Sequence, residues 1–174
     1  MIARFSGQLH RVITATTRPP RQGEQNGIDY HFLEPSVFAN QIKADAFYEW
    51  AEVHGHTYGT LKASVDELLR SGTDIILNID VQGAATFRKA AQNKDFPGRL
   101  ISIFILPPNI EELRKRMCGR GLDAEAIIEQ RLHNAKREIA TAQEYDHRIL
   151  SGSPDEDLDA ASQIYTTEQG PVSH

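Results

Sequence analysis

The sequence predicts an α/β fold, a parallel sheet flanked by helices with a small β-rich lobe inserted into it. Two short runs, residues 74–79 (DIILNI) and 100–106 (LISIFIL), are almost continuously apolar, as buried parallel strands are. Helical patterns alternate with these runs, which is typical of layered α/β proteins. Residues 12–58 differ, because short β-like pieces there surround a single helical pattern.

The individual elements follow from local signals. Gly72 ends one helical pattern and Gly121 ends another, and the start of this second pattern, Asn109 with Glu112, resembles a capping box. Strands are expected at residues 12–17, 30–33, 47–53, 74–79, 100–106 and 148–150, and helices at 36–43, 61–71, 83–91, 110–120 and 123–143. The polar end after about Tyr165 is expected to be disordered.

Composition limits the function classes. With 174 residues, 40% of them hydrophobic and 25% charged, the chain is expected to form one globular domain, residues 1–174. A net charge of -5 argues against nonspecific nucleic-acid binding. We expect a cytoplasmic protein without a membrane partner, because no apolar run approaches the ~18 residues of a span and the first residues do not form a secretory signal. The single cysteine and the histidine spacing indicate no metal site.

Arg18 and Arg21 form the first candidate cluster, in the segment TTRPPRQGEQNGIDY. Two guanidinium groups, held by restricting prolines, are suited to grip one phosphate, and the hydroxyl of Tyr30 offers another donor. The alternative is an ordinary solvated turn.

A second cluster combines carboxylates and hydroxyls. Asp80 ends the most apolar strand pattern, at the strand end where α/β folds place ligands, and Glu49 lies in a half-apolar strand. An ionised carboxylate accepts the adjacent N1–H and 2-amino donors of guanine but repels the N1 lone pair of adenine. Hydroxyls of Thr14 and Thr60 could serve the base atoms O6 and N7. The alternatives are a helix N-cap for Asp80 and a surface ion pair for Glu49.

A third cluster consists of Arg116, Arg120 and Arg131. Arg116 and Arg120 share a helix face and Arg131 follows on the next helix, so the three cations could meet a polyphosphate. The alternative is a solvated face neutralised by neighbouring glutamates.

Five segments in order resemble the guanylate kinase family, from about Phe5 to Asp159. They are VITATTRPPRQGEQNGIDYHF, AFYEWAEVHGHTYGT, IILNIDVQGA, FILPPNIEELRKRMCGRG and the helix of Arg131. The resemblance implies an ATP:GMP phosphotransferase of purine nucleotide metabolism, with a P-loop-kinase-like core, a GMP-binding lobe at residues 14–60 and a helical lid at residues 120–131.

The resemblance also implies the role of each candidate residue. The GMP phosphate would be held by Arg18, Arg21, Tyr30 and Tyr58. Guanine would be read by Thr14, Glu49, Thr60 and Asp80. The phosphates of ATP, the co-substrate brought with Mg²⁺, would meet Arg116, Arg120 and Arg131, and these three with Arg18 would be catalytic.

Two departures from the family pattern qualify these expectations. The 174 residues contain no G-x-x-x-x-G-K-[ST] phosphate loop, and MIARFSGQLH resembles the end of the helix that follows such a loop, so the sheet is expected without its first strand. Asn78 stands where relatives commonly carry an acid near magnesium. Self-association through the incomplete sheet is a further expectation.

Three hypotheses therefore remain open. The first is a guanylate kinase. The second is a catalytically impaired GMP-binding or protein-binding module of the same family, because the phosphate loop contributes donors whose loss typically costs roughly 10²–10³ in rate each. The third is a protein that binds phosphorylated partners through Arg18 and Arg21.

Overall fold

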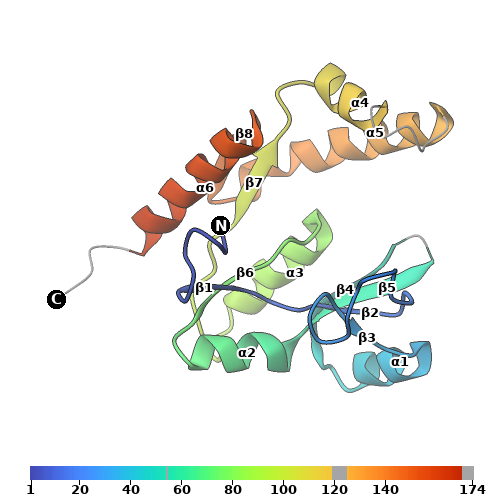
Figure 1. Cartoon of the computed structure of the whole chain (residues 1–174), viewed down its shortest axis with the longest axis vertical. Coiled ribbons are helices and arrows are strands. Elements are labelled where there is room, and N and C mark those ends of the chain that lie inside the picture. The colour runs from blue at the N-terminus through green and yellow to red at the C-terminus, as the bar shows by residue number, and fades with distance from the viewer. Residues whose placement is uncertain (54, 119–124, 170–174) are drawn as a thin grey trace. The chain divides into compact units, whose positions relative to one another are not determined.

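The computed structural model describes residues 1–53, 55–118 and 125–169. The chain divides into two compact units, one of residues 2–100 and one of residues 101–174 with Met1. Each unit combines helices with parallel strand pairs, which confirms the α/β prediction. The elements are labelled in Figure 1.

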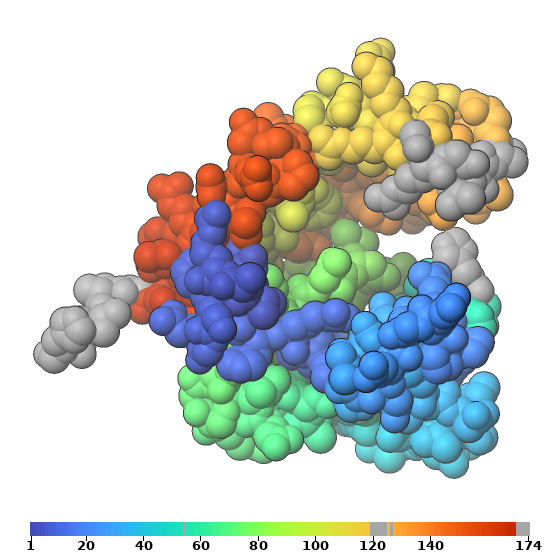
Figure 2. All heavy atoms as spheres, in the orientation of Figure 1, coloured from blue at the N-terminus to red at the C-terminus, as the bar shows by residue number. Residues whose placement is uncertain are grey.

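A four-stranded sheet forms one part of the unit of residues 2–100. Its strand order is β3-β2-β5-β4. The strands are β2 (Ala15–Thr16), β3 (His31–Phe32), β4 (Phe47–Val53) and β5 (His56–Leu61). Helix α1 (Pro35–Lys43) packs on one face, where Phe38 stacks on Phe47 with ring centroids 4.4 Å apart and Ala15 is fully buried. Figure 2 shows residues around 20–40, in blue, on the surface of this lobe.

A parallel strand pair and two helices form the rest of this unit. Strand β1 (Leu9–Arg11) pairs with β6 (Asp74–Ile76). Helices α2 (Lys62–Arg70) and α3 (Val81–Ala91) contribute Val65 and Phe87 to a core that also contains Val12. Tyr48 of β4 lies on Phe87, with ring centroids 5.1 Å apart. Tyr48 thus joins the four-stranded sheet to this core, while Ala15, Phe38 and Phe47 form a second hydrophobic cluster.

The second unit has its own strand pair. Strand β7 (Ile103–Leu106) runs parallel to β8 (His147–Leu150). The helices are α4 (Ile110–Cys118), α5 (Glu125–Ala140), the 3₁₀ turn η1 (Ala142–Glu144) and α6 (Pro154–Glu168). Asp146 ties the start of the strand pair together, because Oδ2 accepts the backbone N–H of Ser102 at 2.7 Å and its hydroxyl at 2.6 Å. Among the described residues, none of the helices has both the length and the apolar character of a membrane span.

Several boundaries differ from the sequence prediction. The predicted strand at 12–17 is wrong in extent, because pairing occupies Leu9–Arg11 and Ala15–Thr16 separately. Residues 2–8 form turns rather than a helix, with one helix-like hydrogen bond from Leu9 N to Phe5 O and a left-handed Gly7 at φ 81°. Helix α6 continues through Glu168, so the prediction of disorder from about Tyr165 is wrong for the described part.

Candidate functional site

The register of the four-stranded sheet brings distant polar and aromatic residues onto one face. Alternate residues of a strand share a face. Thr16 pairs with Tyr58 and with Phe32, and Glu49 pairs with Thr60. Continuing these registers by one or two residues places Thr14 and Tyr30 on the same face. We call this set the candidate face: Thr14, Thr16, Tyr30, Phe32, Glu49, Tyr58 and Thr60.

A β-bulge turns Glu49 onto this face. Phe47 pairs with Leu61 but Glu49 pairs with Thr60, so β4 carries one extra residue between the two pairs. Phe47 therefore packs beneath the sheet on Phe38, while Tyr48 and Glu49 both turn toward α3. A strand without the bulge would place Glu49 opposite Gly59, on the other face.

Glu49 is a partly buried carboxylate with a hydroxyl partner. The hydroxyl of the fully buried Thr60 donates to Glu49 Oε1 at 2.5 Å. Burial and the nearby charge of Asp80 raise the pKa of the Glu49 carboxyl above its ordinary value, against the opposing effect of the Thr60 hydrogen bonds. The hydrogen bond to Thr60 replaces the surface ion pair considered from the sequence. Since Thr60 gives its hydrogen to Glu49, that hydrogen is not available to a ligand in this state.

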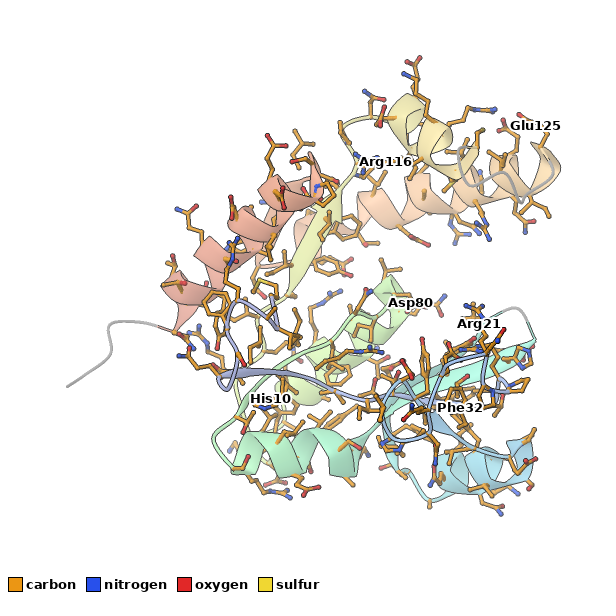
Figure 3. All side chains as sticks on the ribbon, in the orientation of Figure 1. His10, Arg21, Phe32, Asp80, Arg116 and Glu125 are labelled. Atoms are coloured by element: carbon orange, nitrogen blue, oxygen red, sulfur yellow. The ribbon has the colours of Figure 1, made fainter. Side chains whose placement is uncertain are left out.

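Asp80 stands at the N-terminus of α3, next to Glu49. Its Oδ1 accepts the backbone N–H of Gly83 at 2.8 Å, so the N-cap interpretation is confirmed. Asp80 is nevertheless exposed, and it shares Gly83 as a neighbour with Glu49, because a Cβ on Gly83 would lie 3.2 Å from Glu49 Oε2. Figure 3 labels Asp80 at the start of α3.

Arg18 is held over the aromatic part of the candidate face. Its guanidinium lies 5.6 Å from the ring centre of Tyr30 and 5.8 Å from that of Phe32. Nη1 donates to the carbonyl of Pro19 at 2.8 Å, and Nη2 donates to both carboxylate oxygens of Glu24 at 2.9 Å. Partial burial alone would lower the pKa of Arg18, but hydrogen bonds to Glu24 and Tyr58 raise it above its ordinary value. Arg18 is therefore an ordered cation rather than part of a solvated turn.

Arg21 occupies the same turn but differs from Arg18. Its side chain is exposed, and its backbone N–H donates to Glu24 Oε2 at 2.7 Å. Figure 3 labels Arg21 and Phe32 on the lobe.

Three contributors escaped the sequence prediction. Glu24 pairs with Arg18, Phe32 lies under the guanidinium, and Gly83 leaves space beside Glu49 that a Cβ would enter. The sequence could have indicated Glu24 as a partner for the arginines, since Glu24 and Asp29 are the only acidic residues between Arg21 and Tyr30. The contacts of the other two depend on strand register and helix packing.

The arginines of the third cluster lie in the other unit. Arg116, labelled in Figure 3, is on α4 and donates from Nη1 to Ser151 Oγ at 3.0 Å, and its Nε lies 3.4 Å from Glu112. Arg131 is half-buried on α5. Arg120 lies outside the described residues, as do residues 120–124 of the predicted lid. Arg114 pairs with Glu125 and Glu129 and so joins α4 to α5.

A cavity of about 520 Å³ lies elsewhere in the unit of residues 2–100, between the start of β4, α2 and α3. Several of its polar groups pair with one another. Tyr48 donates to Asp66 at 2.5 Å, Asp66 also pairs with Arg70, and Lys62 pairs with Asp45. We place the candidate site on the candidate face rather than in this cavity, because the residues selected by their chemistry, Arg18, Glu49 and Thr60, lie on or over that face. The part of the chain that the structure describes holds no group of three or more His, Cys, Asp or Glu side chains suited to a metal ion.

Comparison with known proteins identifies the family. The family model described as guanylate kinase matches residues 1–167. The chain belongs to the guanylate kinase family. Its similarity to the guanylate kinase of Polaromonas sp. is 45% identity over 143 residues, covering 82% of this chain and 66% of that protein. The guanylate kinase of Zymomonas mobilis is 37% identical over 162 residues, covering 93% of this chain and 73% of that protein.

A solved guanylate kinase structure also matches this family member. The crystal structure from Anaplasma phagocytophilum gives a TM-score of 0.76 at 30% identity, covering 98% of this chain and 81% of that one. The chain spans 66% and 65% of the first two curated guanylate kinases that it matches, slightly under two thirds of their length.

Proposed function

We propose that this chain is a guanylate kinase that transfers the γ-phosphoryl group of MgATP to GMP, giving ADP and GDP. One observation supports this proposal most strongly: a single sheet face carries an ordered arginine at one end and a paired carboxylate at the other. Tyr58 and Thr60, two residues apart on β5, mark the two ends. Alternate residues of a strand are about 7 Å apart, so the two ends are separated along β5.

The arginine end suits a phosphate. Beyond its hydrogen bonds to Pro19 and Glu24, the guanidinium of Arg18 retains N–H groups that can donate to phosphate oxygens, and the exposed Arg21 in the same turn can approach from a second side. The rings of Tyr30 and Tyr58 meet edge to face, 6.1 Å apart, which orients both phenols beside Arg18. Their hydroxyls supply further donors.

The carboxylate end suits guanine. Thr60 fixes one oxygen of Glu49, and in this proposal the other oxygen accepts from N1–H and the 2-amino group of guanine, with Asp80 as a second acceptor. Adenine offers a lone pair at N1 and is repelled. Because Thr60 is committed to Glu49, donation to guanine O6 falls to Thr14.

The donor side of the reaction is assigned to the arginines of the other unit. A phosphate oxygen of GMP attacks the γ-phosphorus of ATP as the bond from that phosphorus to the ADP oxygen breaks. Catalysis of this step consists mainly of positioning and charge stabilisation. We assign charge stabilisation to Arg116, Arg120 and Arg131, with residues 120–131 as the lid. Magnesium enters as part of the substrate MgATP.

Calorimetry and a turnover assay test the proposal together. We expect GMP to bind the chain at least 100-fold more tightly than AMP, and we expect ADP release from MgATP that depends on added GMP. GMP binding without turnover would support the impaired binding module instead. Binding that depends on the phosphate but not on the base would support the third hypothesis, a protein that binds phosphorylated partners through Arg18 and Arg21. Sedimentation tests the self-association expected from the sequence.

A further inference from the structure

Gly83 lies beside both carboxylates to which the proposed function assigns guanine, Glu49 and Asp80. It is buried in the first turn of α3, and its backbone N–H donates to Asp80 Oδ1 at 2.8 Å. A Cβ built on Gly83 would lie 3.2 Å from Glu49 Oε2 and 3.3 Å from Glu49 Cδ and Cγ. The three nearest neighbours of that position thus all belong to one side chain.

The backbone does not require glycine here. Gly83 is helical and is absent from the residues with positive φ, so an alanine could adopt its conformation. Glycine inside a helix is also less favourable than alanine. The remaining reason for glycine is the space that its missing methyl group leaves for the Glu49 carboxylate.

A methyl group in that space would displace Glu49 rather than α3. Glu49 cannot retreat toward Thr60, because that hydrogen bond is already 2.5 Å long. The carboxylate would have to rotate or slide along the candidate face. Asp80 would stay in place, since its partner is the backbone N–H at residue 83, which alanine retains.

We propose that Gly83 is a positioning residue that sets the Glu49 carboxylate relative to Asp80 and so determines base specificity. The inference rests on the proposed function. A correctly aimed carboxylate accepts from N1–H and the 2-amino group together, whereas inosine monophosphate (IMP) offers N1–H alone. Displacing Glu49 therefore weakens GMP binding more than IMP binding.

The test compares Gly83→Ala with Gly98→Ala by calorimetry with GMP and IMP and by thermal melting. Gly98 is the matched control, because its Cβ would meet the Leu69 side chain at the same 3.2 Å, away from the candidate face. We expect Gly83→Ala to lose about tenfold in GMP affinity and less than about threefold in IMP affinity, from one weakened charged hydrogen bond. Its melting temperature should stay unchanged or rise. Gly98→Ala should keep the GMP/IMP ratio.

Glu49→Asp completes a double-mutant cycle, because the shorter side chain makes room for the methyl group. In this background Gly83→Ala should change GMP affinity less than about twofold. If Gly83→Ala alone does not fold, the double variant should fold, and failure of both would show that the methyl group meets something other than Glu49.

Several results would overturn the proposal. One is an unchanged GMP/IMP ratio in Gly83→Ala. Another is equal loss of both ligands with a lowered melting temperature, which indicates a purely structural role. A wild-type chain that binds no GMP would refute the proposed function, and this inference with it, before any variant is compared.

Discussion

Replacing Glu49 by glutamine should strengthen the fold and weaken GMP binding. The glutamine carbonyl still accepts the hydrogen bond from Thr60, but its amide group points donors at the donors of guanine. A hydrogen bond to a charged group contributes about 1.5–3 kcal/mol. Since about 1.4 kcal/mol is a factor of ten, we expect GMP affinity to fall by roughly 10- to 150-fold in calorimetry.

The effect on stability has the opposite sign and depends on pH. Burial, with the charge of Asp80, raises the pKa of Glu49 in the folded chain. The folded state therefore holds the proton more tightly, and wild-type stability falls as pH rises from the ordinary glutamate value, about 4.3, through the raised value. Glutamine carries no charge to bury. Glu49→Gln should unfold at higher urea concentration than wild type at pH 7, and this advantage should disappear below about pH 4.

Two results would refute this reasoning. A variant that is less stable than wild type at pH 7 would show that the charge of Glu49 stabilises the fold. A variant that binds GMP as tightly as wild type would show that Glu49 does not read the base.

Three further changes test other contacts. Thr60→Val removes the donor that fixes Glu49, and GMP affinity should fall about tenfold in calorimetry; equal affinity would show that the hydroxyl has no part in binding. Arg18→Lys replaces the several fixed donors of a guanidinium by one ammonium group, so GMP binding should weaken by about tenfold or more while guanosine binding is unchanged. An equal loss for both ligands would place Arg18 away from the phosphate. Burial alone would raise the pKa of Asp146, but hydrogen bonds from Ser102 lower it below the ordinary aspartate value. The charged Asp146 therefore stabilises the fold at pH values above the ordinary aspartate pKa, and this stabilisation is lost as pH falls through the lowered pKa. Asp146→Asn should therefore lower the urea midpoint at pH 7, with the difference closing at acid pH, and a constant difference would contradict the assignment.

The fold was predictable wherever periodicity and local caps act within a few residues. The helix at 36–43 is found at Pro35–Lys43, and the apolar runs at 74–79 and 100–106 contain β6 and β7. Strand ends were poorly predicted, because apolar residues continue beyond the last paired residue. Asp80 showed that one residue can satisfy two interpretations, since it caps α3 and also lies beside Glu49.

The candidate site was predictable in its residues but not in its arrangement. Glu49, Tyr58 and Thr60 could be chosen by chemistry, yet their common face depends on a bulge between Phe47 and Glu49 that no local pattern signals. The position of Gly83 beside Glu49 brings a helix against a strand more than 30 residues away in the chain. Such contacts follow from strand register and packing, which sequence periodicity does not encode.

The central claim is that one sheet face binds both ends of GMP. A titration of the ¹⁵N-labelled chain with GMP, followed by two-dimensional NMR, tests it most directly. The amides of Arg18, Tyr58, Thr60 and Gly83 should shift together with a single dissociation constant. Shifts confined to other elements, or to only the phosphate or only the base end of the candidate face, would contradict the claim.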